Sequence, residues 1–202
     1  GGPQASVEEI GSLMVASFTA SKLRWVRDEE PENAQRAASV LLPHDFVSLQ
    51  LAESGTAPFT DRGDASGTGY YSTREEAWKP ELVEAALGKG LDLPRLPEAP
   101  HEVMARTASG AAIAAGTGDN MGAALGLSLG PGDVSVSIGT SGVCAMVSDT
   151  RPGDASGTAS YSGKSLCSTP PSRRGATSTA PRMVTMSACT PLLSRNRRRM
   201  AG

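Results

Sequence analysis

The sequence has few cysteines and lacks both a long hydrophobic run and a signal-peptide pattern. Its three cysteines, Cys144, Cys167 and Cys189, have no metal-ligand spacing, which argues against a disulfide scaffold and indicates a reducing compartment, the cytoplasm. No apolar stretch approaches the roughly 18 residues that a membrane helix needs, so we expect no membrane partner. The chain opens with neither a methionine nor a basic segment followed by an apolar one, and we therefore expect a fragment of a longer protein.

Acidic residues are missing from the end of the chain. Residues 1–154 hold all 21 acids and 11 Lys/Arg, a balance of −10, whereas residues 155–202 hold 8 Lys/Arg and no acid, a balance of +8. Because Ser, Thr, Pro and Arg dominate there, we expect residues 161–202 to be disordered. The abrupt change motivates the hypothesis of a reading-frame shift near residues 158–162, which independent DNA sequencing that confirmed the same frame would refute. The basic run Arg195–Arg199 has no interleaved aromatic residue, so we interpret it as a solvated tail and expect no nucleic-acid partner.

Hydrophobic spacing and proline placement predict several helices in the first half of the chain. One helix is predicted to begin at Thr19 and to end at Pro31, and a short helix is predicted over Glu32–Val40. A third is predicted in Leu41–Leu49, with Pro43 in its first turn, and a fourth over Pro80–Leu87, ended by Gly88. Ser72 to Glu75 fits a capping box, and Gly55–Ser72 is typical of an ordered loop. We interpret Lys22 as a surface cation and Trp25 as a core residue.

A β-hairpin is predicted further along the chain. Asp133–Ile138 alternates valine and isoleucine with serine, which indicates a strand with one buried face. Gly139, Thr140, Ser141 and Gly142 turn this strand, and Val143–Val147 is predicted to return as its hairpin partner, with Cys144 as a small buried residue. The glycine turn is an ordinary one by itself, and its functional interpretation is a contact with phosphate oxygens through backbone N–H groups and hydroxyls.

The stretch with most functional content is Gly116–Asn120. The small apolar residues Ala111–Ala115 precede it and the helical segment Met121–Leu129 follows it. Strand, tight turn and helix is the layout that places polar groups at the carboxyl edge of a sheet, where α/β proteins bind ligands. The turn displays Asp119 and Asn120. We predict Asp119 to be the main functional residue of the protein, although Asp and Asn are also common in turns without a function.

Five segments, in this order, resemble the FGGY family of carbohydrate kinases, and within it the xylulokinases. They are Ser17–Glu29, Leu42–Phe46, Asp61–Gly69, Gly116–Asn120 and Ser137–Gly142. The resemblance covers roughly residues 11–160. It implies an α/β protein with the two-lobed actin-like ATPase fold, which has a ribonuclease-H-like sheet in each lobe. Residues 1–131 would be the later part of the first, sugar-binding lobe, and residues 132–160 the start of the second, nucleotide-binding lobe.

The same resemblance implies an activity and its residues. The parent enzyme would transfer phosphate from ATP, with Mg²⁺, to D-xylulose, and a homodimer is expected. Asp119 matches the catalytic aspartate, which accepts the proton of the attacking sugar hydroxyl and contacts the sugar, and Asn120 matches a sugar-binding position. The four residues Gly139, Thr140, Ser141 and Gly142 match a phosphate-binding loop. No protein ligand for a metal is predicted.

The chain also departs from the family, and alternatives stay open. It lacks the family's opening hairpin with an Asp-Gly-Thr phosphate loop, so the chain on its own is expected to be inactive. Ser21 replaces a common proline, and His44 replaces a common lysine. The alternatives are a family member acting on ribulose, gluconate or glycerol, and a non-catalytic sugar-binding relative, in which no base would be needed at Asp119.

Overall fold

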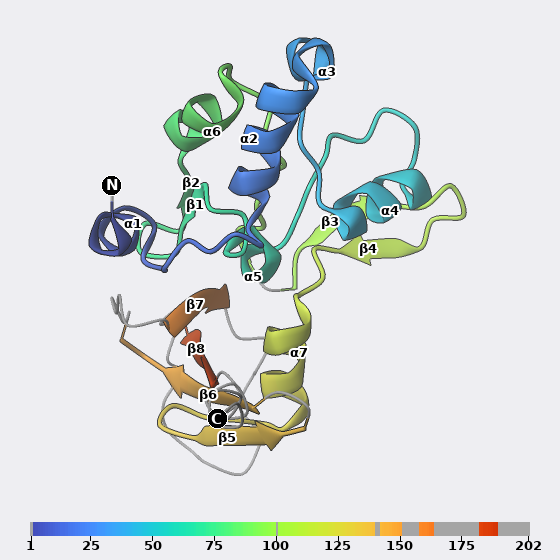
Figure 1. The fold of residues 1–202 in the computed structure, drawn as a ribbon. Coiled ribbons are helices and arrows are strands. Elements are labelled where there is room, and N and C mark those ends of the chain that lie inside the picture. The colour runs from blue at the N-terminus through green and yellow to red at the C-terminus, as the bar shows by residue number, and fades with distance from the viewer. Residues whose placement is uncertain (1, 100, 140–141, 151–157, 164–181, 190–202) are drawn as a thin grey trace, which may run out of the picture.

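The computed structural model describes residues 2–99, 101–139, 142–150, 158–163 and 182–189, the last two ranges as backbone. Helices gather in the first part of the chain and strands in the second (Figure 1). The helices are α1 (Pro3–Ile10), α2 (Thr19–Glu29), α3 (Pro31–Arg36), α4 (Pro43–Leu51), α5 (Arg62–Ala65), α6 (Pro80–Leu87) and α7 (Asp119–Gly126). The strands are β1 (Tyr71–Ser72), β2 (Ala77–Trp78), β3 (Val103–Arg106), β4 (Ala112–Ala114), β5 (Val134–Ile138), β6 (Gly142–Ser148), β7 (Thr158–Gly163) and β8 (Arg182–Cys189). No helix in the described ranges is long and apolar enough to cross a membrane.

The helices α2, α4 and α6 lie where the hydrophobic, proline and glycine pattern predicts. Pro31, Pro43 and Pro80 occupy the first position of α3, α4 and α6, where a missing N–H leaves no bond unmade. Gly88 ends α6 in the left-handed conformation, with a φ of 89°. The helix predicted over Glu32–Val40 is shorter than expected, because α3 ends at Arg36.

The main core lies between α2 and α6. Leu23 of α2 packs with Val83 and Leu87, which are one turn apart on α6, and Tyr70 completes the cluster. Such i, i+4 pairs form one face of a helix. Trp25 lies outside this core with 55% of its surface exposed, so its interpretation as a core residue was wrong.

The loop between α4 and α6 contains more regular structure than expected. It includes α5 and the antiparallel hairpin of β1 and β2. The Glu75 N–H does donate to Ser72 Oγ over 3.2 Å, but no helix follows it. Instead, the Thr73 N–H donates to the Ile10 carbonyl of α1, and Glu76 takes a φ of 55° that turns the chain into β2. The capping-box prediction is therefore wrong as a helix start.

Strand, turn and helix follow one another around Gly116–Asn120 as predicted. β4 precedes the turn, and α7 begins at Asp119. In the described part of the chain, β4 pairs with β3 in a two-stranded antiparallel ribbon. α7 then connects this region to a second sheet (Figure 1).

This second, four-stranded sheet, which follows the two-stranded pairs β1–β2 and β3–β4, has the strand order β5-β6-β8-β7, with all neighbours antiparallel. The predicted hairpin of β5 and β6 is present, with Val136 paired to Cys144. Val147 of β6 packs against Ala124 of α7. The expected burial of the valine face is wrong: Val136 is 65% and Ile138 87% exposed, and Cys144 is exposed as well. The serine face of β5 is the one that lies toward α7, because Ser135 and Ser137 line a cavity together with residues of that helix.

The structure also differs from the expected disorder of residues 161–202. Residues 161–163 belong to β7, and Arg182–Cys189 forms β8 between β6 and β7. The β8 sequence contains Val184 and Thr185, which are β-branched residues that favour strands. The rest of this segment, with the Arg195–Arg199 run, lies outside the described residues.

Candidate active site

A cleft of about 440 Å³ lies where the first turns of α4, α5 and α7 meet. Its lining includes an aromatic ring and several convergent polar groups, namely Phe18, His44, Asp64, Asp119 and Asn120. A concave site with a few polar groups is the usual form of a small-molecule site. Every one of these polar residues lies within the first turn or so of a helix.

Asp119 is the first residue of α7 and is exposed to the cleft. Its Oδ1 accepts the Asn120 N–H over 2.7 Å, which holds the carboxylate at the end of the helix. The N-terminal end of a helix favours negative charge. Asn120 lines both this cleft and a second cavity of about 220 Å³ between α7 and the β5–β6 hairpin.

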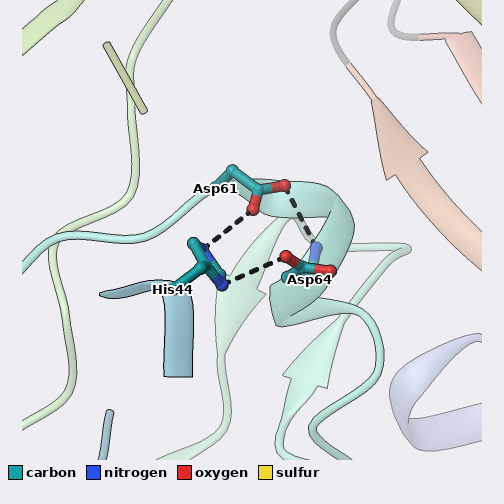
Figure 2. Close-up of side chains that lie close together, drawn as sticks. All are labelled: His44, Asp61 and Asp64. Carbon is teal, nitrogen blue, oxygen red and sulfur yellow. Dashed lines mark hydrogen bonds and ion pairs between the residues drawn. The ribbon is translucent and has the colours of Figure 1, made fainter. Parts of the chain in front are cut away.

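Three carboxylates surround the imidazole of His44. Figure 2 shows two of them, Asp61 and Asp64. His44 Nε2 lies 2.8 Å from Asp45 Oδ1 and 3.4 Å from Asp61 Oδ2, and Nδ1 lies 3.2 Å from Asp64 Oδ2. Asp45 and Asp61 are buried, whereas His44 and Asp64 are partly exposed at the cleft. The contacts of Nε2 are ion pairs without hydrogen-bond alignment, so the attraction is one of charge.

The two buried carboxylates are fixed by backbone groups on their other side. Asp61 precedes α5, and its Oδ1 accepts the N–H groups of Gly63 and Asp64 over 2.7 and 3.1 Å. Asp45 Oδ2 accepts the Leu42 N–H at the start of α4 over 2.8 Å. Each carboxylate therefore caps the start of a helix with one oxygen and faces His44 with the other.

These contacts shift the proton affinity of the cluster. The carboxylates of Asp45 and Asp61 raise the pKa of His44 to about 10, against the opposing effect of burial. Burial and the neighbouring Asp61 raise the pKa of Asp64, Asp119 and Asp45 add to the rise, and the His44 cation opposes it. At neutral pH His44 is therefore an imidazolium.

The charge state of His44 argues against a metal at this cluster. One donor atom each from His44, Asp61 and Asp64 lie within 4.8 Å of one another. An imidazolium has no lone pair to offer, however, and both nitrogens already face carboxylates. The cluster fits an ion-pair network better than a metal centre.

A close contact joins this network to the start of α7. Gly118 is buried and precedes Asp119, and a Cβ at Gly118 would lie 2.6 Å from Asp64 Oδ1. No side chain fits there without moving Asp64 or α7. Only a glycine lets the Asp64 carboxylate lie against the Gly118–Asp119 turn.

Comparison with known proteins identifies the family. Residues 1–126 match the N-terminal domain of the FGGY family of carbohydrate kinases, which is more than half of the chain. The chain belongs to this family. It is 44% identical over 167 residues to the xylulose kinase of Streptomyces coelicolor and 40% identical over 168 residues to that of Streptomyces rubiginosus. Each alignment covers 78% of this chain and 34% of the relative, so the chain spans about a third of the length of these relatives.

Solved structures confirm the expected fold. A xylulose kinase from Bifidobacterium adolescentis superposes with a TM-score of 0.76 at 29% identity, over 92% of this chain and 40% of the other. A glycerol kinase from Plasmodium falciparum superposes with a TM-score of 0.75 at 14% identity, over 93% of this chain and 38% of the other, and shows the fold alone. The chain is thus part of an α/β actin-like ATPase fold.

Within this family setting, the structure brings only some of the predicted site residues together. Asp119 and Asn120 lie in the cleft. Of the predicted phosphate loop, Gly139 and Gly142 lie at the turn end of the β5–β6 hairpin and line neither cavity described above. Thr140 and Ser141 lie outside the described residues.

From the sequence alone, no role is predicted for His44, Asp61 and Asp64. Two signals could have pointed to them. Both Leu42–Phe46 and Asp61–Gly69 are among the segments that carry the family resemblance, and both have an acid or a histidine next to a helix start. The sequence alone could not show that these three residues contact one another in the folded chain.

Proposed function

We propose that this chain forms the sugar-binding side of an ATP-dependent kinase that converts D-xylulose to D-xylulose 5-phosphate. The observation that carries the proposal is the position of Asp119, at the start of α7 and open to a cleft of about 440 Å³. The choice of D-xylulose is supported by the relatives named xylulose kinase at 44% and 40% identity. A cytoplasmic location and a homodimer stay predictions.

In this proposal Asp119 is the catalytic base. Phosphoryl transfer to an alcohol needs the acceptor hydroxyl in line with the phosphate and a group that receives its proton. Asp119 would accept that proton, and Asn120 beside it would bind the sugar. Because the Asn120 N–H occupies Asp119 Oδ1, the Oδ2 atom is the better placed proton acceptor.

ATP and Mg²⁺ belong to the proposal as well. ATP supplies the phosphoryl group, and Mg²⁺ neutralises the charge of its phosphates. Gly139, Thr140, Ser141 and Gly142 would receive the phosphates, and the exposed backbone of Gly139 fits such a close approach. Asn120 lines both cavities, which is where the sugar side and the nucleotide side would meet. No residue of the chain is assigned as a Mg²⁺ ligand.

The proposal is tested by replacing Asp119 in the gene product that contains this chain. Asp119→Asn keeps the size and the helix start but removes the base, so kcat should fall about 10²- to 10⁴-fold, with sugar binding retained in calorimetry. Asp92→Asn, an exposed position outside the cleft, is the matched control. Turnover retained in Asp119→Asn would contradict the assignment.

A substrate panel separates the alternatives. D-xylulose should give a higher kcat/KM than D-ribulose, gluconate and glycerol. A higher kcat/KM for one of these three substrates would instead assign the protein the activity of another member of the family. Sugar binding without any phosphate transfer by the unaltered gene product would favour the non-catalytic relative.

A further inference from the structure

The cluster around His44 places three carboxylates within reach of one imidazole. Asp45 comes from α4, and Asp61 and Asp64 come from the start of α5. Two of them are buried, and like charges this close repel one another strongly where water is excluded. His44 is the one cation in contact with all three among the described residues. Its charge is therefore what allows them to lie together.

Asp64 links this cluster to the proposed base. One of its oxygens faces His44 Nδ1 at 3.2 Å (Figure 2), and the other fills the space in front of the Gly118 Cα. Gly118 is the residue before Asp119, so the Asp64 carboxylate sets how the start of α7 lies. The charges of Asp64 and Asp119 also repel each other, and without a cation Asp64 would be driven away from the turn.

We propose that His44 is a positioning residue for sugar phosphorylation, which holds Asp64 against the Gly118–Asp119 turn and so presents the Asp119 carboxylate to the sugar hydroxyl. The inference rests on the proposed function, because it assigns His44 a role through Asp119. The groups that face His44 in the described structure are Asp45, Asp61 and Asp64, with Asp119 next beyond Asp64.

A double-mutant cycle tests this role. His44→Gln should lower kcat of the gene product about 10- to 100-fold and change KM less than threefold, because an ill-placed base affects the chemical step. In the Asp64→Asn background the same change should lower kcat less than threefold, because the carboxylate that His44 holds is gone. His44→Lys should keep kcat within about threefold of the unaltered enzyme, since the Nε2 contacts depend on charge rather than on alignment. An equal effect of His44→Gln in both backgrounds would overturn the proposal.

A readout without turnover keeps the inference separate from the proposed function. In ¹⁵N-labelled chain, the amide shift of Asn120 reports its bond to Asp119 Oδ1. His44→Gln should move this resonance, His44→Lys should restore it, and Asp64→Asn should remove most of the difference between His44 and its glutamine variant. The chain has two histidines, and His101→Gln is the control substitution, which should leave the Asn120 resonance unchanged.

The kinetic and the NMR measurements distinguish a failure of the proposed function from a failure of the role proposed for His44. If no sugar is phosphorylated but the Asn120 shift depends on His44 through Asp64, the proposed function fails and the link from His44 to the turn stands. An Asn120 resonance that ignores His44 would overturn the link even in an active enzyme. Should His44→Gln fail to fold, His44→Lys alone and with Asp64→Asn carries the test: a loss of kcat of more than tenfold in His44→Lys would contradict a role based on charge.

Discussion

A half-buried imidazolium among carboxylates couples proton binding to folding. The pKa of His44 is raised from its ordinary value of 6.5 to about 10 in the folded chain. The folded state therefore binds the proton more tightly than the unfolded chain does. The stability that results is fully present below pH 6.5 and is lost as the pH rises through about 10. With 36% of the side chain exposed, solvent screening reduces the size of the effect.

This sign gives a prediction for unfolding. We expect the urea midpoint of the unaltered chain to exceed that of His44→Gln most at pH 6, and the difference to shrink steadily between pH 7 and pH 10. His44→Lys should keep its advantage to higher pH, because the ordinary pKa of lysine, about 10.4, already lies near the top of this window. A difference between the chain and His44→Gln that stayed constant from pH 6 to pH 10 would show that the His44 proton plays no part in stability.

At the scale of one element, the close approach of α7 to α5 requires a glycine at position 118. A methyl group at Gly118 would lie 2.6 Å from Asp64 Oδ1, whereas one at Gly122 in the same helix would have its nearest neighbour at 3.8 Å. Gly118→Ala should therefore destabilise the chain by about 1–3 kcal/mol through overpacking, and weaken sugar binding as Asp119 moves. Gly122→Ala should leave binding unchanged and stabilise the helix by up to about 1 kcal/mol. Thermal unfolding and calorimetry with D-xylulose measure both, and equal behaviour of the two variants would refute the steric argument.

Elements were predictable from the sequence where a local cause decides them. Pro43 and Pro80 at helix starts, Gly88 at a helix end and the serine–valine alternation of β5 act within a few residues, and the helices and the strand that they predict are present, although the valine face of β5 is exposed rather than buried. The turn after Ser72 was mistaken for a helix because a long-range bond from Thr73 to Ile10 decides it. The site divides in the same way. Asp119 follows from a local strand–turn–helix pattern, whereas the contact of His44 with Asp64 requires the tertiary fold.

At the scale of the whole molecule, the second sheet has an open apolar face. Val134, Val136 and Ile138 project from β5 with 54, 65 and 87% of their surfaces exposed. The alternation that predicted one buried face is thus present, but nothing in the described part of the chain buries that face. The proposed boundary near residue 131, between a sugar-binding and a nucleotide-binding lobe, stays a prediction, as does the origin of the segment after residue 160.

The open face makes a last prediction, on the chain as a whole. A contiguous exposed apolar strand face binds hydrophobic dyes and favours association. The double variant Val136→Thr with Ile138→Thr should lower ANS fluorescence and shift size-exclusion elution toward the monomer, with stability changed by less than about 0.5 kcal/mol per site because both residues are exposed. Val147→Thr, at a residue with only 3% exposure on the neighbouring strand, is the control and should destabilise by about 1–3 kcal/mol, since its hydroxyl would be buried without a partner. ANS binding that did not respond to the double variant would contradict this prediction, because it would mean that β5 is covered in solution.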